Sequence, residues 1–467
     1  KPLLGLAQRC VGTGPPEAVW FFCLRRRPML SVHDFLNLSA ALLLLLVEWL
    51  FRSVARVLYI ALPAPLLLQW ERCMEKVLRL AAGDSEPYDE RRDYDAGRLI
   101  RDHGYPVEEY TVETRDGYLI TIHRIPYGRD ANGSKEKKRL PVLIMHGFLE
   151  CSEVWLPRGP KKSLPYVLAD AGYEVWLGNV RGNRYGCKHV SLNTRSYDFW
   201  KFGMDEMIRF DLPAIIGRML KTSKSERYAY IGFSQGTGIG FGLFSTNPEL
   251  AERATIFIAL APAARVNGVK LTLVDTLMRC DPNIIYLMFG RRRLLGMTIF
   301  WRALLPQKTY VKLIDICTWY LFGWEMRNIN EKEKSVLYGH LYSLGSVRTM
   351  VHWFQTIARG RFQMYDDEAS KAANKRYPSH IPPEYPIRQI KVPTALFYGG
   401  SDTLCDMPWL LDQLKDTPLR SFCIDEYEHL DFQFSSSAHT KVYPMVTKLI
   451  QNSVKSSGLV SKSELGN

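Results

Sequence analysis

Short runs rich in β-forming residues alternate with longer segments of helical periodicity, and this alternation limits the possible folds more than any other feature. The clearest runs cover residues 141–147, 173–179, 228–234, 256–262 and 394–400. Strands that alternate with helices, such as the helical segment 205–220, pack into a mostly parallel sheet with helices on both faces. We therefore expect an α/β fold, preceded by a hairpin over residues 111–125 that turns at Asp116 and Gly117.

The run that ends at residue 234 leads into GFSQG (232–236), which fits the pattern GxSxG. The pattern alone is weak, but here a β-rich run precedes the serine and a helix start rich in small residues follows it. A sharp turn from strand to helix exposes such a serine in a strained conformation, and Gly232 and Gly236 leave the room that the turn requires. We predict that Ser234 is a nucleophile.

A serine hydroxyl is a poor nucleophile at neutral pH, so it needs a base, and the base needs an acid that orients it. Asp402 follows the last of the β-rich runs, and His429 follows the next β-like run. The order serine, acid, histidine is that of α/β-hydrolases. We predict Asp402 as the acid and His429 as the base. Asp406 is the main alternative acid and Asp431 a weaker one, while His439 lies in an expected closing helix.

Acyl transfer passes through a tetrahedral oxyanion, which needs backbone N–H donors already in position. We expect one donor at Gln235, the residue after the nucleophile. The second is expected at Phe148, in the turn HGF (146–148) that ends an early strand. His146 precedes the nucleophile in chain order, so we expect it to stabilise this turn and not to act as a base.

Residues 263–385 contain no clear strand but many Leu, Met and aromatic residues at helical spacing. A helical insertion in a parallel sheet covers the carboxyl ends of the strands, where ligands bind. We predict a helical cap over 263–385, between a first part of the core at 73–262 and a second part at 386–455. The alternative is that these aromatic residues only fill the core of a helical subdomain.

The amino-terminal region differs in composition from the rest. Residues 1–34 are basic, and we expect a leader that is either a processed targeting segment or the flank of a membrane insertion. Residues 35–72 are strongly apolar, but Glu48 interrupts the run and Pro63 would break a helix. This pattern favours a membrane-associating hairpin or interfacial helix, with a helix packed on the protein's own core as the alternative. Residues 456–467 are expected to form a polar tail.

The formal net charge of +13 is spread over short clusters of Lys and Arg. Such clusters suit an anionic lipid surface as well as nucleic acid. The sequence contains no zinc-finger spacing, RNP-like strand or phosphate loop, so we expect no nucleic-acid partner. Nine cysteines without a paired spacing argue against a disulfide framework. We expect neither a cofactor nor a metal, and the sequence identifies no protein partner.

Several segments, in order, resemble the acid lipase family of α/β-hydrolases, which includes gastric and lysosomal acid lipases and fungal steryl ester hydrolases. They include HGFLECSEVW (146–155), GNVRGNRYGCKHVSL (178–192), YIGFSQGTG (230–238), YGGSDTLCD (398–406) and YEHLDF (427–432). In the expected cap, YSLGSVRTMVHWFQ (342–355) is most similar to the membrane-anchored steryl ester hydrolases.

This resemblance implies an α/β-hydrolase fold with Ser234, Asp402 and His429 as the catalytic triad and Phe148 and Gln235 at the oxyanion hole. The sequence departs from the family where Phe148 replaces the usual leucine, which keeps the backbone donor but narrows the acyl entrance.

Together these features predict a serine esterase that cleaves a water-insoluble lipid ester, either a steryl ester or a triacylglycerol, at a membrane or lipid-droplet surface. The expected location is the endoplasmic reticulum or lipid droplets, with a mitochondrial membrane as the alternative. A catalytically idle structural or lipid-holding subunit, descended from a lipase, is the competing hypothesis. Acyl transfer to an alcohol other than water would use the same residues.

Overall fold

The computed structural model describes residues 89–129, 139–266, 278–294, 305–367 and 382–456, together with the single residues 275, 296 and 302. The predicted leader (1–34) and membrane-associating segment (35–72) lie outside these ranges, as does the tail from residue 457 onward. Within the described ranges, every helix is too short or too polar to span a bilayer.

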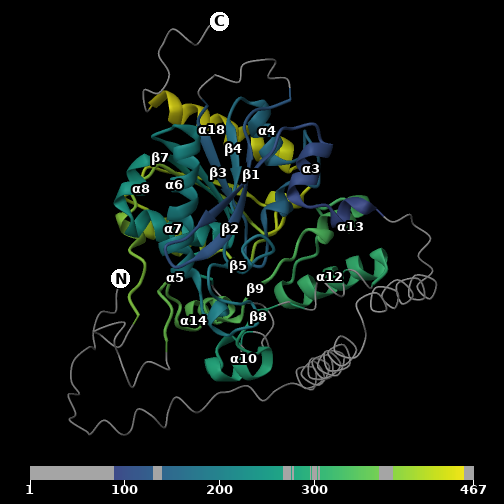
Figure 1. The fold of residues 1–467 in the computed structure, drawn as a ribbon, viewed down its shortest axis with the longest axis vertical. Coiled ribbons are helices and arrows are strands. Elements are labelled where there is room, and N and C mark those ends of the chain that lie inside the picture. Colours follow the sequence, from purple (N-terminus) through teal and green to yellow (C-terminus); the bar gives the residue numbers. More distant parts are fainter. Residues whose placement is uncertain are drawn as a thin grey trace, which may run out of the picture. The chain divides into compact units, whose positions relative to one another are not determined.

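One mixed sheet forms the centre of the fold (Figure 1). In spatial order its strands are β1 (Glu108–Glu113), β2 (Tyr118–Ile125), β4 (Glu174–Leu177), β3 (Pro141–Met145), β6 (Tyr228–Phe233), β7 (Ala254–Leu260), β10 (Thr394–Gly399) and β11 (Leu419–Ile424), and β5 (Lys188–His189) pairs with β2. Neighbours from β4 to β11 are parallel, whereas β1 pairs antiparallel with β2, and β2 with β4. The predicted α/β fold and its leading hairpin are confirmed.

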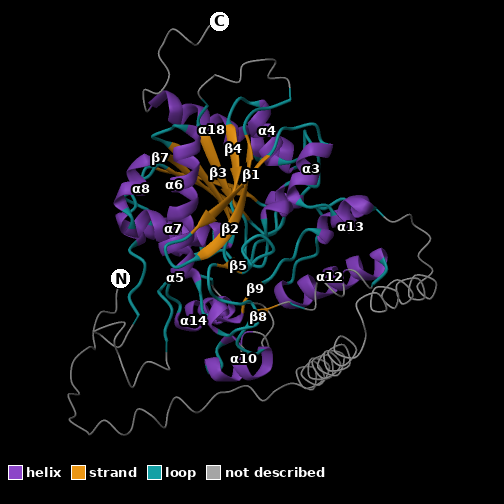
Figure 2. Cartoon of the chain, in the orientation of Figure 1, coloured by secondary structure: helices purple, strands orange, loops and turns teal. Residues whose placement is uncertain are grey.

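Helices cover both faces of the sheet (Figure 2). One face carries α3 (Ala96–Asp102), α4 (Leu164–Asp170) and α18 (Tyr443–Ser456), and the other carries α6 (Leu212–Ser223), α7 (Gln235–Thr246), α8 (Pro248–Arg253) and α15 (Met407–Gln413). Because side chains alternate along a strand, each strand contributes to two cores. In β3, Val142 and Ile144 pack with the first group of helices, and Leu143 and Met145 with the second.

The helix predicted over 205–220 is interrupted. The chain forms α5 (Met204–Glu206), then the π-helical segment η5 (Met207–Asp211), and only then α6. Pro213, at the start of α6, has no N–H for a regular intrahelical hydrogen bond, and a widened turn before it accommodates that loss.

The described residues of the expected cap (263–385), which lies between β7 and β10, are mainly helical. They form α10 (Pro282–Phe289), α12 (Gln307–Phe322), α13 (Glu331–Gly339) and α14 (Val347–Arg359). The short strands β8 (Arg293–Leu294) and β9 (Gly345–Ser346) pair with each other and were not expected, because two residues leave no alternating pattern. In Figure 1, α10, α12 and α14 gather at one end of the sheet. Trp353 of α14 donates to the Gln235 side chain (2.8 Å), so the insertion contacts the carboxyl end of β6.

The remaining helices are short. They are η2 (Glu90–Asp93), η3 (Ser152–Trp155), η4 (Asp198–Trp200), η7 (Ile387–Gln389), α16 (Asp431–Phe434) and α17 (Ala438–Lys441). The cysteines in the described part of the chain are all free thiols.

Candidate active site

Ser234 lies in the tight turn between β6 and α7, with φ of 48° and ψ of −116°. A positive φ is strained for any residue other than glycine, so the surrounding packing must hold this turn in place. A Cβ on Gly232 would lie 2.6 Å from the backbone of Gly236, and one on Gly236 would lie 2.7 Å from the carbonyl oxygen of His146. The turn therefore requires glycine at both positions, because no side chain fits.

His429 lies in the loop after β11 and bridges the other two predicted residues. Its Nε2 is 2.7 Å from Ser234 Oγ, and its Nδ1 is 2.7 Å from Asp402 Oδ2. A carboxylate beside Nδ1 favours the tautomer with the proton on that nitrogen, which leaves Nε2 able to accept the serine proton. The fold thus brings together three side chains from the carboxyl ends of β6, β10 and β11 in the arrangement of a nucleophile, a base and an orienting acid.

Asp402 is buried and accepts three hydrogen bonds. Besides His429, its partners are the Leu404 N–H (2.9 Å) and the Cys405 thiol (3.0 Å). Burial raises the pKa of the Asp402 carboxyl, but His429 and these hydrogen bonds outweigh burial and leave the pKa below its ordinary value. Asp402 is therefore a carboxylate at neutral pH, as an orienting acid must be.

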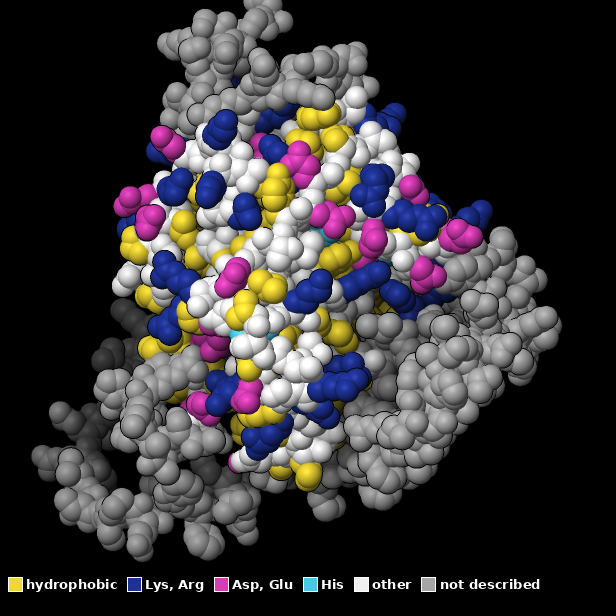
Figure 3. All heavy atoms as spheres, viewed as in Figure 1, with side chains coloured by type: hydrophobic (Ala, Val, Ile, Leu, Met, Phe, Trp, Pro, Cys, Tyr) yellow, Lys and Arg dark blue, Asp and Glu magenta, His cyan; other side chains and the backbone are white. Residues whose placement is uncertain are grey.

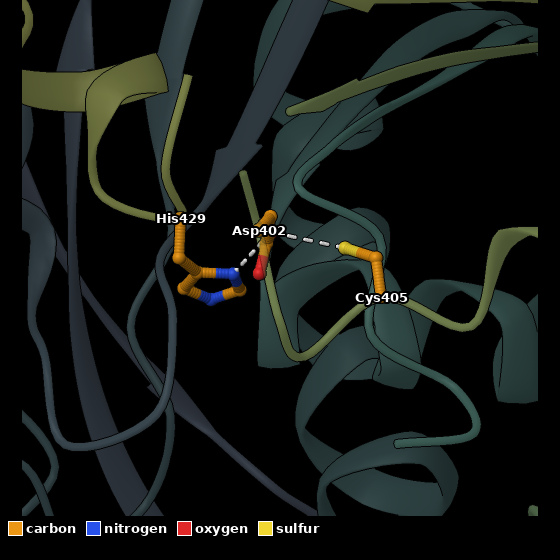
Figure 4. Close-up of side chains that lie close together, drawn as sticks. All are labelled: Asp402, Cys405 and His429. Atoms are coloured by element: carbon orange, nitrogen blue, oxygen red, sulfur yellow. Dashed lines mark hydrogen bonds and ion pairs between the residues drawn. The ribbon is translucent and has the colours of Figure 1, made fainter. Parts of the chain in front are cut away.

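Asp402, Cys405 and His429 are also residue types that bind metals, and their ligand atoms lie within 4.8 Å of one another. Figure 4 shows Asp402 between the imidazole and the thiol, in hydrogen-bonding contact with both. The second imidazole nitrogen faces Ser234. The ligand atoms of Asp402, Cys405 and His429 are thus already hydrogen-bonded to one another or to Ser234. The geometry therefore fits a triad better than a metal centre.

Phe148 lies in the turn after β3, and Gln235 is the first residue of α7. Among the described residues, neither backbone N–H donates to a protein acceptor. The N–H of Gly147, in contrast, is used by the Glu150 carboxylate (2.7 Å). Since β3 and β6 are parallel neighbours, these two free donors lie at the same edge of the sheet, where they can stabilise an oxyanion.

Comparison with known proteins identifies the family. Residues 97–159 match the partial alpha/beta-hydrolase lipase region, and residues 141–264 match the alpha/beta hydrolase fold. A probable lipase of Schizosaccharomyces pombe is 37% identical over 350 residues, which cover 75% of this chain and 78% of that protein. Human lysosomal acid lipase/cholesteryl ester hydrolase is 35% identical over 378 residues, covering 79% of this chain and 94% of that protein.

This chain belongs to the acid lipase family of α/β-hydrolases. Human gastric triacylglycerol lipase is also similar, at 35% identity over 365 residues, which cover 77% of this chain and 91% of that protein. Membership in the family makes this chain a lipase-type carboxylic ester hydrolase.

In this acid lipase, the alternative acids make other contacts. Asp406 caps α15 by accepting the Trp409 N–H (3.3 Å), and it pairs with Arg265 (3.1 Å). Asp431 accepts the Glu428 N–H (2.6 Å) and an amide hydrogen of a nearby asparagine (2.9 Å). The alternative histidine His439 lies on α17.

His146 of the lipase is buried in the turn that follows β3. Its Nε2 lies 3.1 Å from Asn183 Nδ2, and its Nδ1 lies 2.8 Å from the Gly147 carbonyl oxygen. Burial lowers the pKa of His146 to about 4, so the ring is neutral at physiological pH. These contacts fit the predicted role in stabilising the turn.

The lipase also contains a buried acid beside the oxyanion turn that the sequence did not single out. Glu150 accepts hydrogen bonds from the Gly147 N–H (2.7 Å) and from Gln433 Nε2 (3.2 Å) of α16. It therefore joins the oxyanion turn to the segment that follows His429. Burial raises the pKa of Glu150 to about 7, although the two hydrogen bonds and the charge of His429 oppose the rise. No local pattern marks a glutamate as buried, so only the packing identifies it.

We expect this acid to make the stability of the lipase depend on pH. The folded pKa of about 7 lies above the ordinary value of 4.5. The contribution of Glu150 to stability is therefore fully present below about pH 4.5 and is lost as the pH rises through about 7. Glu150→Gln keeps an acceptor for the Gly147 N–H but cannot ionise. The unfolding free energy of this variant minus that of wild type should increase by about 3 kcal/mol from below about pH 4.5 to above about pH 7. Denaturant unfolding over a pH series measures this difference, and a flat difference would contradict the assignment.

A hollow of about 740 Å³ lies at the opposite edge of the lipase sheet, at the amino ends of β6, β7, β10 and β11. Basic side chains of Arg227, Lys391 and Arg420 and apolar ones such as Phe244 and Leu449 line it. Because Ser234 lies at the carboxyl end of β6, this hollow is not part of the candidate active site.

Proposed function

We propose that this lipase hydrolyses a water-insoluble lipid ester, either a steryl ester or a triacylglycerol, through an acyl-enzyme on Ser234. The hydrogen-bonded series from Ser234 through His429 to Asp402 carries the proposal, since it gives an otherwise weak nucleophile a base and an orienting acid. The names of the two human relatives, a triacylglycerol lipase and a cholesteryl ester hydrolase, support the two substrate classes.

In the proposed reaction, His429 Nε2 takes the hydroxyl proton of Ser234 as Oγ attacks the ester carbonyl carbon. The carbonyl oxygen becomes an oxyanion, which the N–H groups of Phe148 and Gln235 stabilise. The C–O bond to the alcohol then breaks, and His429 returns its proton to the leaving alcohol. Water then attacks the acyl carbon as His429 takes one of its protons. The bond between that carbon and Ser234 Oγ breaks, His429 returns the proton to Oγ, and the fatty acid leaves. Asp402 keeps the imidazole oriented throughout.

We also propose that the cap meets a lipid surface. Most large apolar side chains that are exposed in the described part of the chain lie on two cap helices. They are Ile284, Leu287 and Met288 on α10, and Leu313, Ile316 and Trp319 on α12. On the face shown in Figure 3, basic side chains lie beside hydrophobic ones in the region of α10. Such a surface supports action at a membrane or lipid droplet. We propose the endoplasmic reticulum or lipid droplets as the location, with a mitochondrial membrane as the alternative, from the composition of the amino-terminal residues alone.

Two charged substitutions on this surface should separate lipid binding from chemistry. Leu287 is 86% exposed and Trp319 is 59% exposed, so aspartate at either position leaves the fold intact. We expect the double variant Leu287→Asp/Trp319→Asp to bind a lipid emulsion at least about tenfold more weakly, because each buried apolar side chain contributes about 1.5–3 kcal/mol. Hydrolysis of a soluble short-chain ester should change less than about twofold.

Co-sedimentation with the emulsion measures binding. Val190→Asp is the matched control, because Val190 is also 59% exposed but lies outside the cap. Equal loss of binding in the control would argue against a docking role for the cap.

The test of the proposed function is hydrolysis by the purified full chain of a sterol oleate, trioleoylglycerol and a short-chain chromogenic ester. A fluorophosphonate probe, which reacts only with an activated serine, supplies a readout that does not depend on substrate choice. Labelling of wild type together with cleavage of at least one long-chain ester is expected. If wild type shows neither probe labelling nor cleavage of a long-chain ester, the proposal is wrong, and an idle lipid-holding protein is the better description.

A further inference from the structure

The imidazole of His429 contacts two aromatic rings from different parts of the chain. The Phe233 ring lies 5.2 Å away at 49°, whereas the indole of Trp324 lies 5.2 Å away at only 8° and is therefore parallel to the imidazole. Phe322 stacks on Trp324 in turn (4.3 Å, 21°). Phe233 belongs to β6 of the core, but Trp324 belongs to the cap, so the cap supplies one wall around the proposed base.

The segment that carries Trp324 is also hydrogen-bonded to the loop that carries His429. We call residues 323–330, which join α12 to α13, the clasp. The N–H groups of Glu325 and Met326 donate to the two carboxylate oxygens of Glu428, at 2.7 and 2.9 Å. Glu428 immediately precedes His429, so this carboxylate ties the clasp directly to the histidine backbone.

A second set of contacts strengthens the same connection. Asn328 Nδ2 donates to Asp431 Oδ2 (2.9 Å) and to the Glu426 carbonyl oxygen (2.8 Å). The Ser436 N–H donates to the Asn328 carbonyl oxygen (2.9 Å). The clasp thus contacts residues on both sides of His429, and its position and that of the histidine loop depend on each other.

Packing holds the indole of Trp324, whereas hydrogen bonds hold the backbone of the clasp around it. The side chain is 4% exposed, and its buried Nε1 has no acceptor among the described residues. Two residues later, Met326 has a positive φ of 54°. An unpaired buried donor and a strained backbone are both unfavourable, and they persist where the surroundings force a particular geometry, as at functional sites.

The parallel stack suits the chemistry of the base. During acyl transfer the imidazole gains a proton, and the face of an indole attracts a cation that lies close to it. The stack also restricts the plane of the imidazole, and that plane must direct Nε2 to Ser234 and Nδ1 to Asp402 at the same time.

We propose that the clasp positions His429 for catalysis. Trp324 is the positioning residue that sets the plane of the imidazole, and Glu428 is the group that ties the clasp to the histidine loop. The inference rests on the proposed function, because it takes His429 as the general base. Its consequence is that the cap contributes to the chemical step itself and does not only cover the substrate.

The first test removes the stacked ring. On a soluble short-chain ester, Trp324→Ala should lower kcat by about tenfold to a hundredfold, the usual effect of misplacing a reacting group, and should leave KM within about threefold. Trp324→Phe should recover most of kcat, because it keeps an aromatic face over the imidazole. Trp409→Ala is the matched control: it removes a half-buried indole from α15, outside the cap, and should leave kcat within about twofold.

The second test does not depend on how Trp324→Ala folds. Glu428→Gln keeps the size of the side chain but replaces one acceptor of the clasp with a donor, so we expect kcat to fall by about three- to tenfold. Glu426→Gln is its control, because the Glu426 side chain pairs with the exposed Lys441 and not with the clasp. The rate of fluorophosphonate labelling should follow kcat in all variants, since it reports on the base without a substrate.

Three results would overturn the inference while wild type remains active: kcat unchanged in both Trp324→Ala and Glu428→Gln, a rise in KM in place of a fall in kcat, or equal losses in the controls. A wild-type chain that neither cleaves an ester nor reacts with the probe would instead overturn the proposed function, and this inference with it.

Discussion

Ser234→Ala is expected to lower kcat for a short-chain ester by about a millionfold. The alanine has no oxygen to form the acyl-enzyme, and no other hydroxyl bonds to His429 Nε2 in the described part of the chain. The small remaining rate should come from the two free N–H donors of Phe148 and Gln235, which can still polarise a bound ester.

Initial rates and fluorophosphonate labelling measure this loss, with thermal unfolding as the check that the chain is folded. The substitution should not destabilise the protein, since alanine fits wherever the serine backbone fits. Ser191→Ala, which removes an exposed hydroxyl outside the turn between β6 and α7, is the control and should retain full activity. Equal labelling of the Ser234→Ala variant and wild type would show that the reactive serine lies elsewhere.

Asp402→Asn should have the second largest effect, a fall in kcat of about ten thousandfold at neutral pH. An asparagine can turn its amide so that an N–H faces His429 Nδ1, which moves the imidazole proton to Nε2. That nitrogen would then present a proton to Ser234 and could not accept one. Asparagine has the size of aspartate and can still accept the Leu404 N–H, so the loss should come from the tautomer and not from unfolding.

The control for this prediction is Asp406→Asn, at the position of the main alternative acid. Asp406 caps α15 and pairs with Arg265, so its replacement should lower the unfolding free energy somewhat. It should lower kcat by less than about tenfold. If Asp406→Asn were the inactive variant and Asp402→Asn the active one, the assignment of the acid would be reversed.

The candidate site was only partly predictable from the sequence. Ser234 could be identified because its signal is local: a strand, two glycines and a helix start within a few residues. For the acid, the sequence favours Asp402 but leaves Asp406 as an alternative, since both follow the same strand within one loop. Their difference is one of direction, because Asp402 faces His429 whereas Asp406 turns to the amino end of α15.

Glu150, Trp324 and Glu428 left no usable signal at all. Glu150 is surrounded by residues of mixed character, and its burial follows from packing against Gln433, 283 positions away. The backbone groups that bind Glu428 lie 102 and 103 positions away. Contacts between residues more than a hundred positions apart depend on how distant segments pack against one another, and no local sequence pattern predicts that packing.

The sequence by itself determined the alternation of strands and helices, the hairpin before them and the strand-to-helix turn at Ser234. It could do so because backbone conformation and side-chain periodicity depend on near neighbours in the chain. Only the tertiary structure decided which acid faces His429, that Glu150 is desolvated, and that a cap residue stacks on the imidazole. Burial, pKa shifts and ring contacts arise when distant segments exclude water from the space between them, and that exclusion exists only in the folded chain.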